Sequence, residues 1–246
     1  IIGSLCGLGG GIIIKPLLDA TSNLDASTIS FLSGLTVLSM SLYSVLHNIK
    51  SKNKIRTEMV IPIAFGAAIG GIFGKILFQK VASLFVNQQI ITIIQSACLL
   101  FLTIGTLVYS LNKDKIITKN VRSTMACGIV GVALGLLSSF LGIGGGPFNI
   151  IILSYLFSMD TKISAQSSLY IILFSQTFSV IYTITSNNVP AFGLSILFVM
   201  VIAGITGGIA GRKINRFLSS NDVNKLFLYV NVFIIIVSIY NIVKII

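Results

Sequence analysis

Long stretches of this chain contain no charged residue. Asp, Glu, Lys and Arg are absent from residues 26–49, 59–74, 81–112, 123–159, 163–211 and 226–243. A helix that spans a bilayer needs about 20 mainly apolar residues, so residues 163–211 are long enough for two spans. The turn-forming sequence SNNVP at 186–190 divides that stretch.

The apolar pattern predicts helices rather than strands, because the stretches are too uniformly apolar for the alternation of a membrane β-barrel. We predict an all-α polytopic membrane protein with eight hydrophobic segments. The first is expected to extend upstream of Ile1, because a glycine motif follows that residue so closely. The segments are about 1–18, 26–48, 58–79, 88–111, 122–158, 163–185, 190–211 and 225–246.

Composition supports a bilayer environment and excludes several classes of function. Hydrophobic residues make up 54% of the chain and charged residues 9%, with a mean hydropathy of +1.00, whereas soluble domains carry about 25% charged residues. The net charge of +11 comes from cations clustered between segments, which indicates cytoplasmic loops beside anionic lipid rather than nucleic-acid binding. We expect a multi-pass protein of the cell membrane, with the lipid bilayer as a partner.

Catalytic and metal-binding chemistry finds no support in the sequence. Cys6, Cys98 and Cys127 lie in apolar segments without CxxC spacing, which is typical of buried cysteines. With a single histidine, His47, placed beside a basic stretch, no catalytic constellation can be assembled. We expect no enzyme, cofactor or metal.

The two halves of the chain resemble each other. GLGGG at 7–11 matches GIGGG at 142–146, and AIGGIFGKIL at 68–77 matches GITGGIAGRKI at 204–214. This regularity indicates duplication of a four-segment unit, as in many transporters. The predicted units are residues 1–112 and 122–246, joined by a basic linker at 113–121.

Cation counts predict how the segments cross the membrane. If all eight cross, nine cations face one side and seven the other; if the two glycine segments turn back, the counts are thirteen and three, with Lys15 inside the membrane. The second arrangement obeys the positive-inside rule. The segment 122–158 is also too long for one crossing. We predict an inverted repeat with two glycine-tipped hairpins that meet near mid-membrane.

The glycine motifs are candidates for an anion site. Consecutive glycines in hydrocarbon leave backbone N–H groups unpaired, which requires protein or a polar cavity around them. Pro147 suits the first turn of a new helix, whose N-terminus from about residue 148 would face the break. The alternative is that these glycines only allow close helix packing. The candidates are Gly9, Gly10, Gly11, Gly144, Gly145, Gly146 and Pro147.

These twin motifs resemble the signatures of the TauE/SafE sulfite exporter family, also called toluene sulfonate uptake permeases. The resemblance covers essentially the whole chain and implies a membrane carrier of small, often sulfur-containing anions such as sulfite or sulfonates. Family members carry a Thr-Ser pair after each motif, which implies that Ser30, Ser167 and Ser168 line the path. Two departures from the family pattern are Lys15 before Pro16, and Asn149 with Ile151 at the second proline position.

Several other polar residues are candidates for specific roles. Lys15 is a candidate anion ligand, with snorkelling to the interface as the alternative; Asn149 is a candidate lining residue, and Gln166 and Gln176 are candidate donors. No Asp or Glu falls within the predicted spans, so proton coupling through a buried carboxylate is unsupported. Lys75 and Arg212, matched across the repeat at predicted helix ends, are interpreted as interfacial anchors.

The sequence therefore predicts a carrier that moves a small anion by alternating access, with export favoured. Its partners are the anionic substrate and the bilayer. The alternatives are a membrane scaffold or assembly subunit, in which the glycines only pack helices, and an anion channel.

Overall fold

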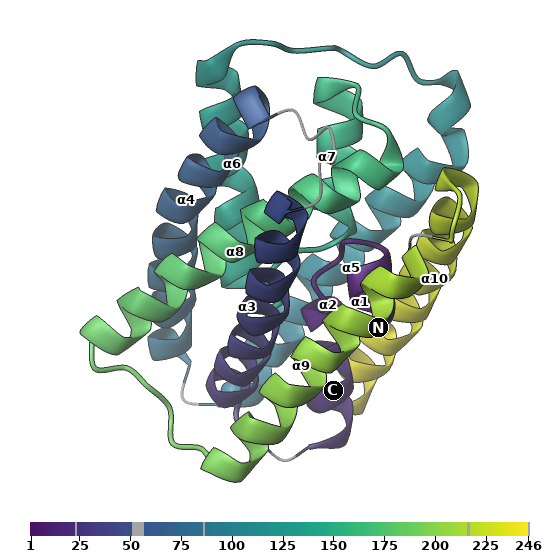
Figure 1. Ribbon diagram of the computed structural model, residues 1–246. Helices are drawn as coiled ribbons and strands as arrows, with labels where there is room; N and C mark the ends of the chain where they lie inside the picture. The colour runs from purple at the N-terminus through teal and green to yellow at the C-terminus, as the bar shows by residue number, and fades with distance from the viewer. Residues whose placement is uncertain (23, 51–56, 86, 216, 246) are drawn as a thin grey trace.

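Helices make up all the regular structure in the described part of the chain (Figure 1). The computed structural model describes residues 1–22, 24–50, 57–85, 87–215 and 217–245. Six helices are long and apolar enough to cross a membrane, as the all-α polytopic prediction requires. They are α3 (Ala26–Lys50), α4 (Thr57–Leu84), α5 (Gln88–Asn112), α8 (Thr161–Thr185), α9 (Leu194–Asn215) and α10 (Ser220–Ile245).

The two glycine segments are broken where the sequence predicted. The first forms α1 (Ile2–Leu5) and α2 (Gly11–Thr21), and the second forms α6 (Thr124–Phe140) and α7 (Pro147–Phe157). A short 3-10 helix, η1 (Lys113–Lys115), follows α5. Pro147 is the first residue of α7, where its missing N–H costs no hydrogen bond. The described chain therefore contains six long helices and, around the two glycine motifs, two pairs of shorter ones.

Several predicted segments end earlier than the helices that they correspond to. Helix α2 continues past residue 18 to Thr21, α4 continues past 79 to Leu84, and α9 continues past 211 to Asn215. A charged side chain ends an apolar run, but Lys and Arg are good helix formers and do not interrupt the backbone hydrogen bonds. Helix α9 begins at Leu194 rather than 190, after Pro190 and Gly193.

One face of the molecule gathers helix ends that are rich in cations. Lys113 Nζ, at the end of α5, donates to Thr161 Oγ1 at the start of α8 over 2.8 Å. Lys162 Nζ donates over 3.0 Å to the carbonyl of Leu218, between α9 and α10. We call this the basic face. The predicted loop cations Lys52, Lys54, Arg56 and Arg216 lie outside the described residues.

Helix α7 returns to the basic face from which α6 starts. The linker that precedes α6 bonds to the end of α7, from Lys119 N to Tyr155 O over 2.9 Å and from Val121 N to Leu156 O over 2.7 Å. Figure 1 shows this linker crossing above α6 and α7. Helices α6 and α7 therefore enter and leave on the same side.

The opposite face also gathers several helix ends. Lys244 Nζ, at the end of α10, donates over 2.8 Å to the carbonyl of Ala20 near the end of α2. Residues at the start of α3, the start of α5 and the end of α10 line one cavity on this face. The α8–α9 connection and the end of α4 line another.

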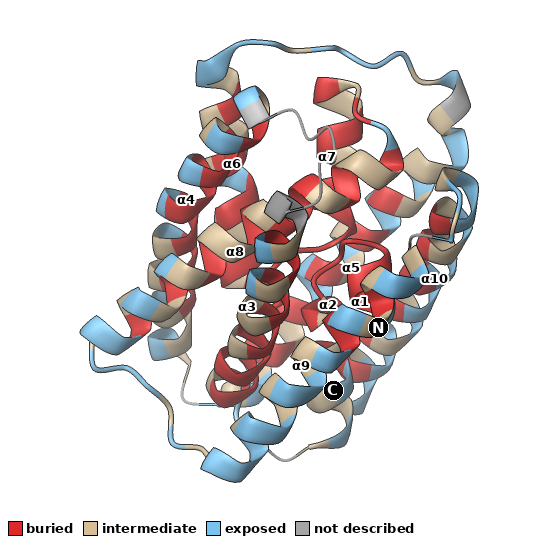
Figure 2. Cartoon of the chain, in the orientation of Figure 1, coloured by how far each residue is buried: buried red, intermediate tan, exposed pale blue. Residues whose placement is uncertain are grey.

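Burial separates a core from a surface suited to lipid. In the best apolar window of α3, 67% of residues are buried, against 11% in α9. Figure 2 shows buried residues concentrated on α2, α3, α7 and α8, while α9 is mostly exposed or intermediate. Large apolar side chains such as Phe198, Val199 and Ile202 are exposed on α9. Such a surface fits contact with lipid.

Helices of each half of the chain pack on helices of the other half. Helix α4 of the first half packs on α6 and α8 of the second, and α9 of the second half packs on α1 and α3 of the first. In the same way, α5 packs on α7 and α10 packs on α2, while α3 meets α8 and α5 meets α10. Each half therefore completes the core of the other.

Candidate functional site

Both breaks are made by glycines in conformations that other residues rarely adopt. Gly9 has a φ of 79° and Gly144, its counterpart in the second motif, a φ of 73°. A Cβ is strongly disfavoured in this left-handed region, so glycine is the residue that permits the turn. We call residues 6–10 and 141–146 the first and second tips.

The two tips meet between α3 and α8. A Cβ on Gly9 would contact the side chains of Ile172 and Val37, at 2.9 and 3.1 Å. One on Gly144 would lie 2.6 Å from Val37, and one on Gly11 would lie 2.3 Å from the carbonyl of Ile143. Val37 and Ile172 stand at the middles of α3 and α8, which have 25 residues each. The tips therefore lie halfway along the two central helices.

The N-terminus of α7 points its partial positive charge at the second tip. Asn149, in the first turn of α7, is fully buried. Its Nδ2 lies 3.4 Å from Ser168 Oγ, and its Oδ1 has no hydrogen-bond partner among the described residues. The amides of Gly145 and Gly146 donate no hydrogen bond within the described chain. A helix N-terminus with free amides and a polar side chain can bind an anion.

The glycines of the second tip also have packing roles. A Cβ on Gly145 would lie 2.6 Å from Ile172, and one on Gly146 would lie 2.7 Å from Phe148. An alanine at either position would therefore disturb packing whether or not the amides contact a ligand. Pro147 is buried directly behind them.

Ser30 and Ser168 lie beside the second tip and the start of α7. Ser30, on α3, faces the second tip, because a Cβ on Gly142 would fall 2.0 Å from its Oγ. Ser33, one turn further, donates to the carbonyl of Gly142. Ser167 and Ser168 on α8 are fully buried, and Ser167 Oγ has no partner in the described chain.

The two candidate glutamines lie in different places. Gln176 is buried on α8, and its Oε1 lies 2.9 Å from the position of a Cβ on Gly34. It lines a small cavity beside Gly142. Gln166 instead lines a cavity of about 40 Å³ on the basic face, together with Lys162, Arg212 and Asn215. Gln166 is therefore not brought to the tips with the other candidates.

Lys15 is not an isolated cation. Its Nζ lies 2.8 Å from Asp19 Oδ2, and the two side chains are 3% and 2% exposed. The sequence interpretation that no acidic residue lies in the apolar interior is thus wrong at Asp19, because α2 continues one turn beyond the predicted segment. The i,i+4 spacing of Lys15 and Asp19 was the available signal. The role of Lys15 as an anion ligand stays a prediction. The charge of Lys15 is balanced by that of Asp19.

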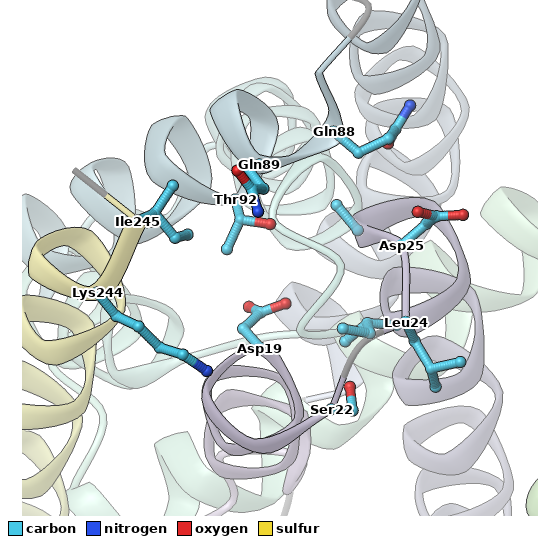
Figure 3. A pocket seen from close by; sticks show the side chains of 11 residues that line it. Asp19, Ser22, Leu24, Asp25, Gln88, Gln89, Thr92, Lys244 and Ile245 are labelled. Atoms are coloured by element: carbon cyan, nitrogen blue, oxygen red, sulfur yellow. The ribbon is translucent and has the colours of Figure 1, made fainter.

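A cavity of about 300 Å³ on the opposite face is lined by Asp19, one member of this ion pair (Figure 3). Asp19 of α2 and Thr92 of α5 line it, with Asp25 at the start of α3. Asp19 Oδ1 is buried and has no hydrogen-bond partner in the described ranges. Asp19 is already paired with Lys15, and Asp25 and Lys244 carry opposite charges, so this cavity has no net positive charge to attract an anion.

Lys75 is the functional candidate that the sequence analysis missed. It was interpreted as an anchor at a helix end, but α4 continues to Leu84 and Lys75 is only 5% exposed. Its Nζ lies 4.7 Å from the centre of the Phe78 ring. The anchor interpretation is therefore wrong for Lys75. Arg212, its counterpart, lies beside Tyr43, with its guanidinium 4.9 Å from the ring centre.

Comparisons with known proteins show the family of this chain. The chain is 27% identical over 220 residues to a "Probable membrane transporter protein" of Haemophilus influenzae, a match that covers 83% of this chain and 78% of that relative. No solved structure matches the chain. The model of the family described as "Sulfite exporter TauE/SafE" matches residues 1–239. With the duplicated glycine motif placed at two meeting helix breaks, this match shows that the chain belongs to the sulfite exporter TauE/SafE family of membrane transporters.

Proposed function

We propose that this transporter is a carrier for a small oxyanion such as sulfite or a sulfonate, bound where the two tips meet. The observation that carries the proposal is the group of buried polar atoms without partners around the tips. In the described chain these are Ser138 Oγ, Ser139 Oγ, Asn149 Oδ1, Ser167 Oγ and Gln176 Nε2. Buried polar groups are nearly always hydrogen-bonded, so a cluster of exceptions in an apolar core indicates a polar ligand or water.

The donor set fits an anion better than a cation. Backbone amides at the start of α7, hydroxyls and the Gln176 amide nitrogen can donate hydrogen bonds, and the helix dipole adds partial positive charge, whereas Asn149 Oδ1 can only accept. Neutral donors hold an oxyanion less tightly than a fixed charge does, which favours its release from the tips. The description of the family supports sulfite as a substrate and export as the direction.

The proposed architecture is an inverted repeat of residues 1–112 and 122–246, joined by the linker 113–121, in the cell membrane. The exchanged helix contacts support it, because each pairing between the halves has a counterpart. The direction of the broken helices supports it as well. Helix α6 runs alongside α4 away from the basic face, and α2 ends on the opposite face. Rocking of one repeat against the other would expose the tips to each side in turn.

This topology predicts that residues 160 and 188 face opposite sides of the membrane. Asp160 precedes α8 beside the basic face, and Asn188 follows α8 on the opposite face. Single cysteines at these positions in intact cells should react with an impermeant thiol reagent at position 188 only. The basic face should be cytoplasmic by the positive-inside rule. Labelling of both positions from outside would contradict the proposal.

Transport should be saturable and selective for sulfur oxyanions. We would reconstitute the purified protein in liposomes and measure uptake of sulfite, sulfate, methanesulfonate and chloride. Asn149→Leu keeps the volume of the side chain but removes its donors, and we expect transport to fall about 10- to 100-fold, as for loss of a hydrogen bond to a charged group. Asn112→Leu, at an exposed position at the end of α5, is the control.

The same assay tests the alternatives. Flux that rises linearly with concentration would favour a channel, and absence of flux for every anion would favour the scaffold. Equal transport by the Asn149→Leu and Asn112→Leu proteins would remove Asn149 from the site.

A further inference from the structure

We propose that Lys75, together with Gln176 and Ser139, binds the transported anion at the inner end of an open cavity on the opposite face. The inference rests on the proposed function and deepens it, because it names a cation and a path that the glycine motifs do not contain. Lys75 belongs to the long helix α4, far in sequence from both tips.

Lys75 stands between two cavities. On one side is an opening of about 380 Å³, lined also by Ser27, Gln79 and Asn188. On the other side is a small cavity of about 10 Å³, lined also by Ser139, Gly142 and Gln176. The first is large enough for a small oxyanion, while the second has room for about one water. An anion that enters from the opposite face therefore meets Lys75 before it reaches the second tip.

The charge of Lys75 is not balanced by a carboxylate. Among the described residues its ammonium group has no ion pair and no hydrogen bond, and it lies over the face of the Phe78 ring. This contrasts with Lys15, which is paired with Asp19. A buried ammonium without a counter-ion is costly, and it marks a candidate functional site inside a membrane protein.

The neighbours of Lys75 in the small cavity are donors that lack acceptors. Gln176 is 3% exposed and its Nε2 has no partner within the described chain. Ser139 is 2% exposed and its Oγ also has none. An oxyanion at the inner end of the larger cavity can place one oxygen, about the size of a water molecule, in this space, where the ammonium, the amide and the hydroxyl donate to it, and the anion supplies the missing charge.

The charges favour this path over the neighbouring one. In the cavity of Figure 3, Asp25 offsets Lys244, and Asp19 is already paired with Lys15, so no net positive charge attracts an anion. In the cavity of about 380 Å³ the one charged lining residue of the described chain is Lys75. The opposite face thus offers an anion one attractive route, which ends at the second tip.

The test measures binding of sulfite and sulfate to purified protein by isothermal titration, with parent, Lys75→Met and Lys75→Arg proteins. We expect Lys75→Met to weaken binding at least about tenfold, because a charged hydrogen bond is lost. Lys75→Arg should retain part of the affinity. Lys80→Met is the matched control, since Lys80 lies on the same helix but is exposed and outside both cavities.

A second measurement separates binding from folding. Lys75→Met removes a buried charge without a counter-ion, so the Tm of the ligand-free protein should stay the same or rise, while the increase in Tm produced by sulfite in the parent should disappear. Unchanged affinity in Lys75→Met would overturn the assignment and leave the proposed function standing. If the parent binds neither anion and transports neither, the proposed function fails and the site fails with it.

Discussion

Replacing Gly70 with alanine should sharply reduce the amount and thermal stability of folded protein. Gly66, Gly70 and Gly74 form a stripe on α4 where the backbone of α6 approaches closely. A Cβ on Gly70 would lie 2.1 Å from the carbonyl oxygen of Val132. Backbone atoms cannot rotate away as side chains can, so the helices must separate. We expect a cost of about 1–3 kcal/mol, the range found for overpacked cores.

The experiment compares Gly70→Ala with Gly105→Ala in detergent, by size-exclusion chromatography and thermal unfolding. Gly105 is also a helical glycine, on α5, but a Cβ there would have no neighbour within 4 Å. Gly105→Ala should leave Tm unchanged or raise it, because alanine has the higher helix propensity by about 1 kcal/mol. Equal Tm values for the two variants would show that α4 and α6 are not packed as described.

The second large effect is expected at the Lys15–Asp19 pair. Lys15→Met leaves the Asp19 carboxylate buried without its counter-ion, and breaking such a pair from one side costs about 3–5 kcal/mol. Asp19→Leu should be similarly harmful, because it leaves the ammonium of Lys15 uncompensated. The double variant, Lys15→Met with Asp19→Leu, removes both charges. Its stability should return close to that of the parent, because replacing both ions by apolar groups is often neutral.

Thermal unfolding of all four proteins gives the coupling free energy of the pair. Losses that simply add in the double variant would contradict the ion pair as a stabilising contact. The double variant also tests the predicted role of Lys15 in binding. If Lys15 contacts the anion as well as Asp19, that protein should be folded but inactive, whereas a purely structural pair predicts normal transport.

Features that depend on local chemistry could be predicted from the sequence. The breaks at residues 6–10 and 141–146 follow from consecutive glycines, and the start of α7 follows from Pro147. Both require only the conformational preferences of the residues themselves. The six long helices could be predicted from the long apolar runs of the sequence.

Features that depend on what covers a helix could not be predicted in this way. Lys75 follows an apolar run, and nothing near it in the sequence indicates that α6, α8 and Phe78 bury it. Asp19 looked like the polar end of a segment, although its partner Lys15 was one turn away. Gln166 and Gln176 are ten residues apart on α8, which separates them by about 15 Å along the helix axis and places them at different cavities.

The exchange of helices between the halves has a consequence for biosynthesis. Helix α4 is complete at residue 84, but its partners α6 and α8 end at residues 140 and 185. At a synthesis rate of about 5–20 residues per second, roughly 5–20 s pass between the completion of α4 and the completion of α8, its later neighbour. During that interval the hydroxyls on α3, including Ser33 and Thr36, lack the helices that bury them. The first half must therefore be held by lipid or by the insertion machinery, and it matures only after the second half has been made.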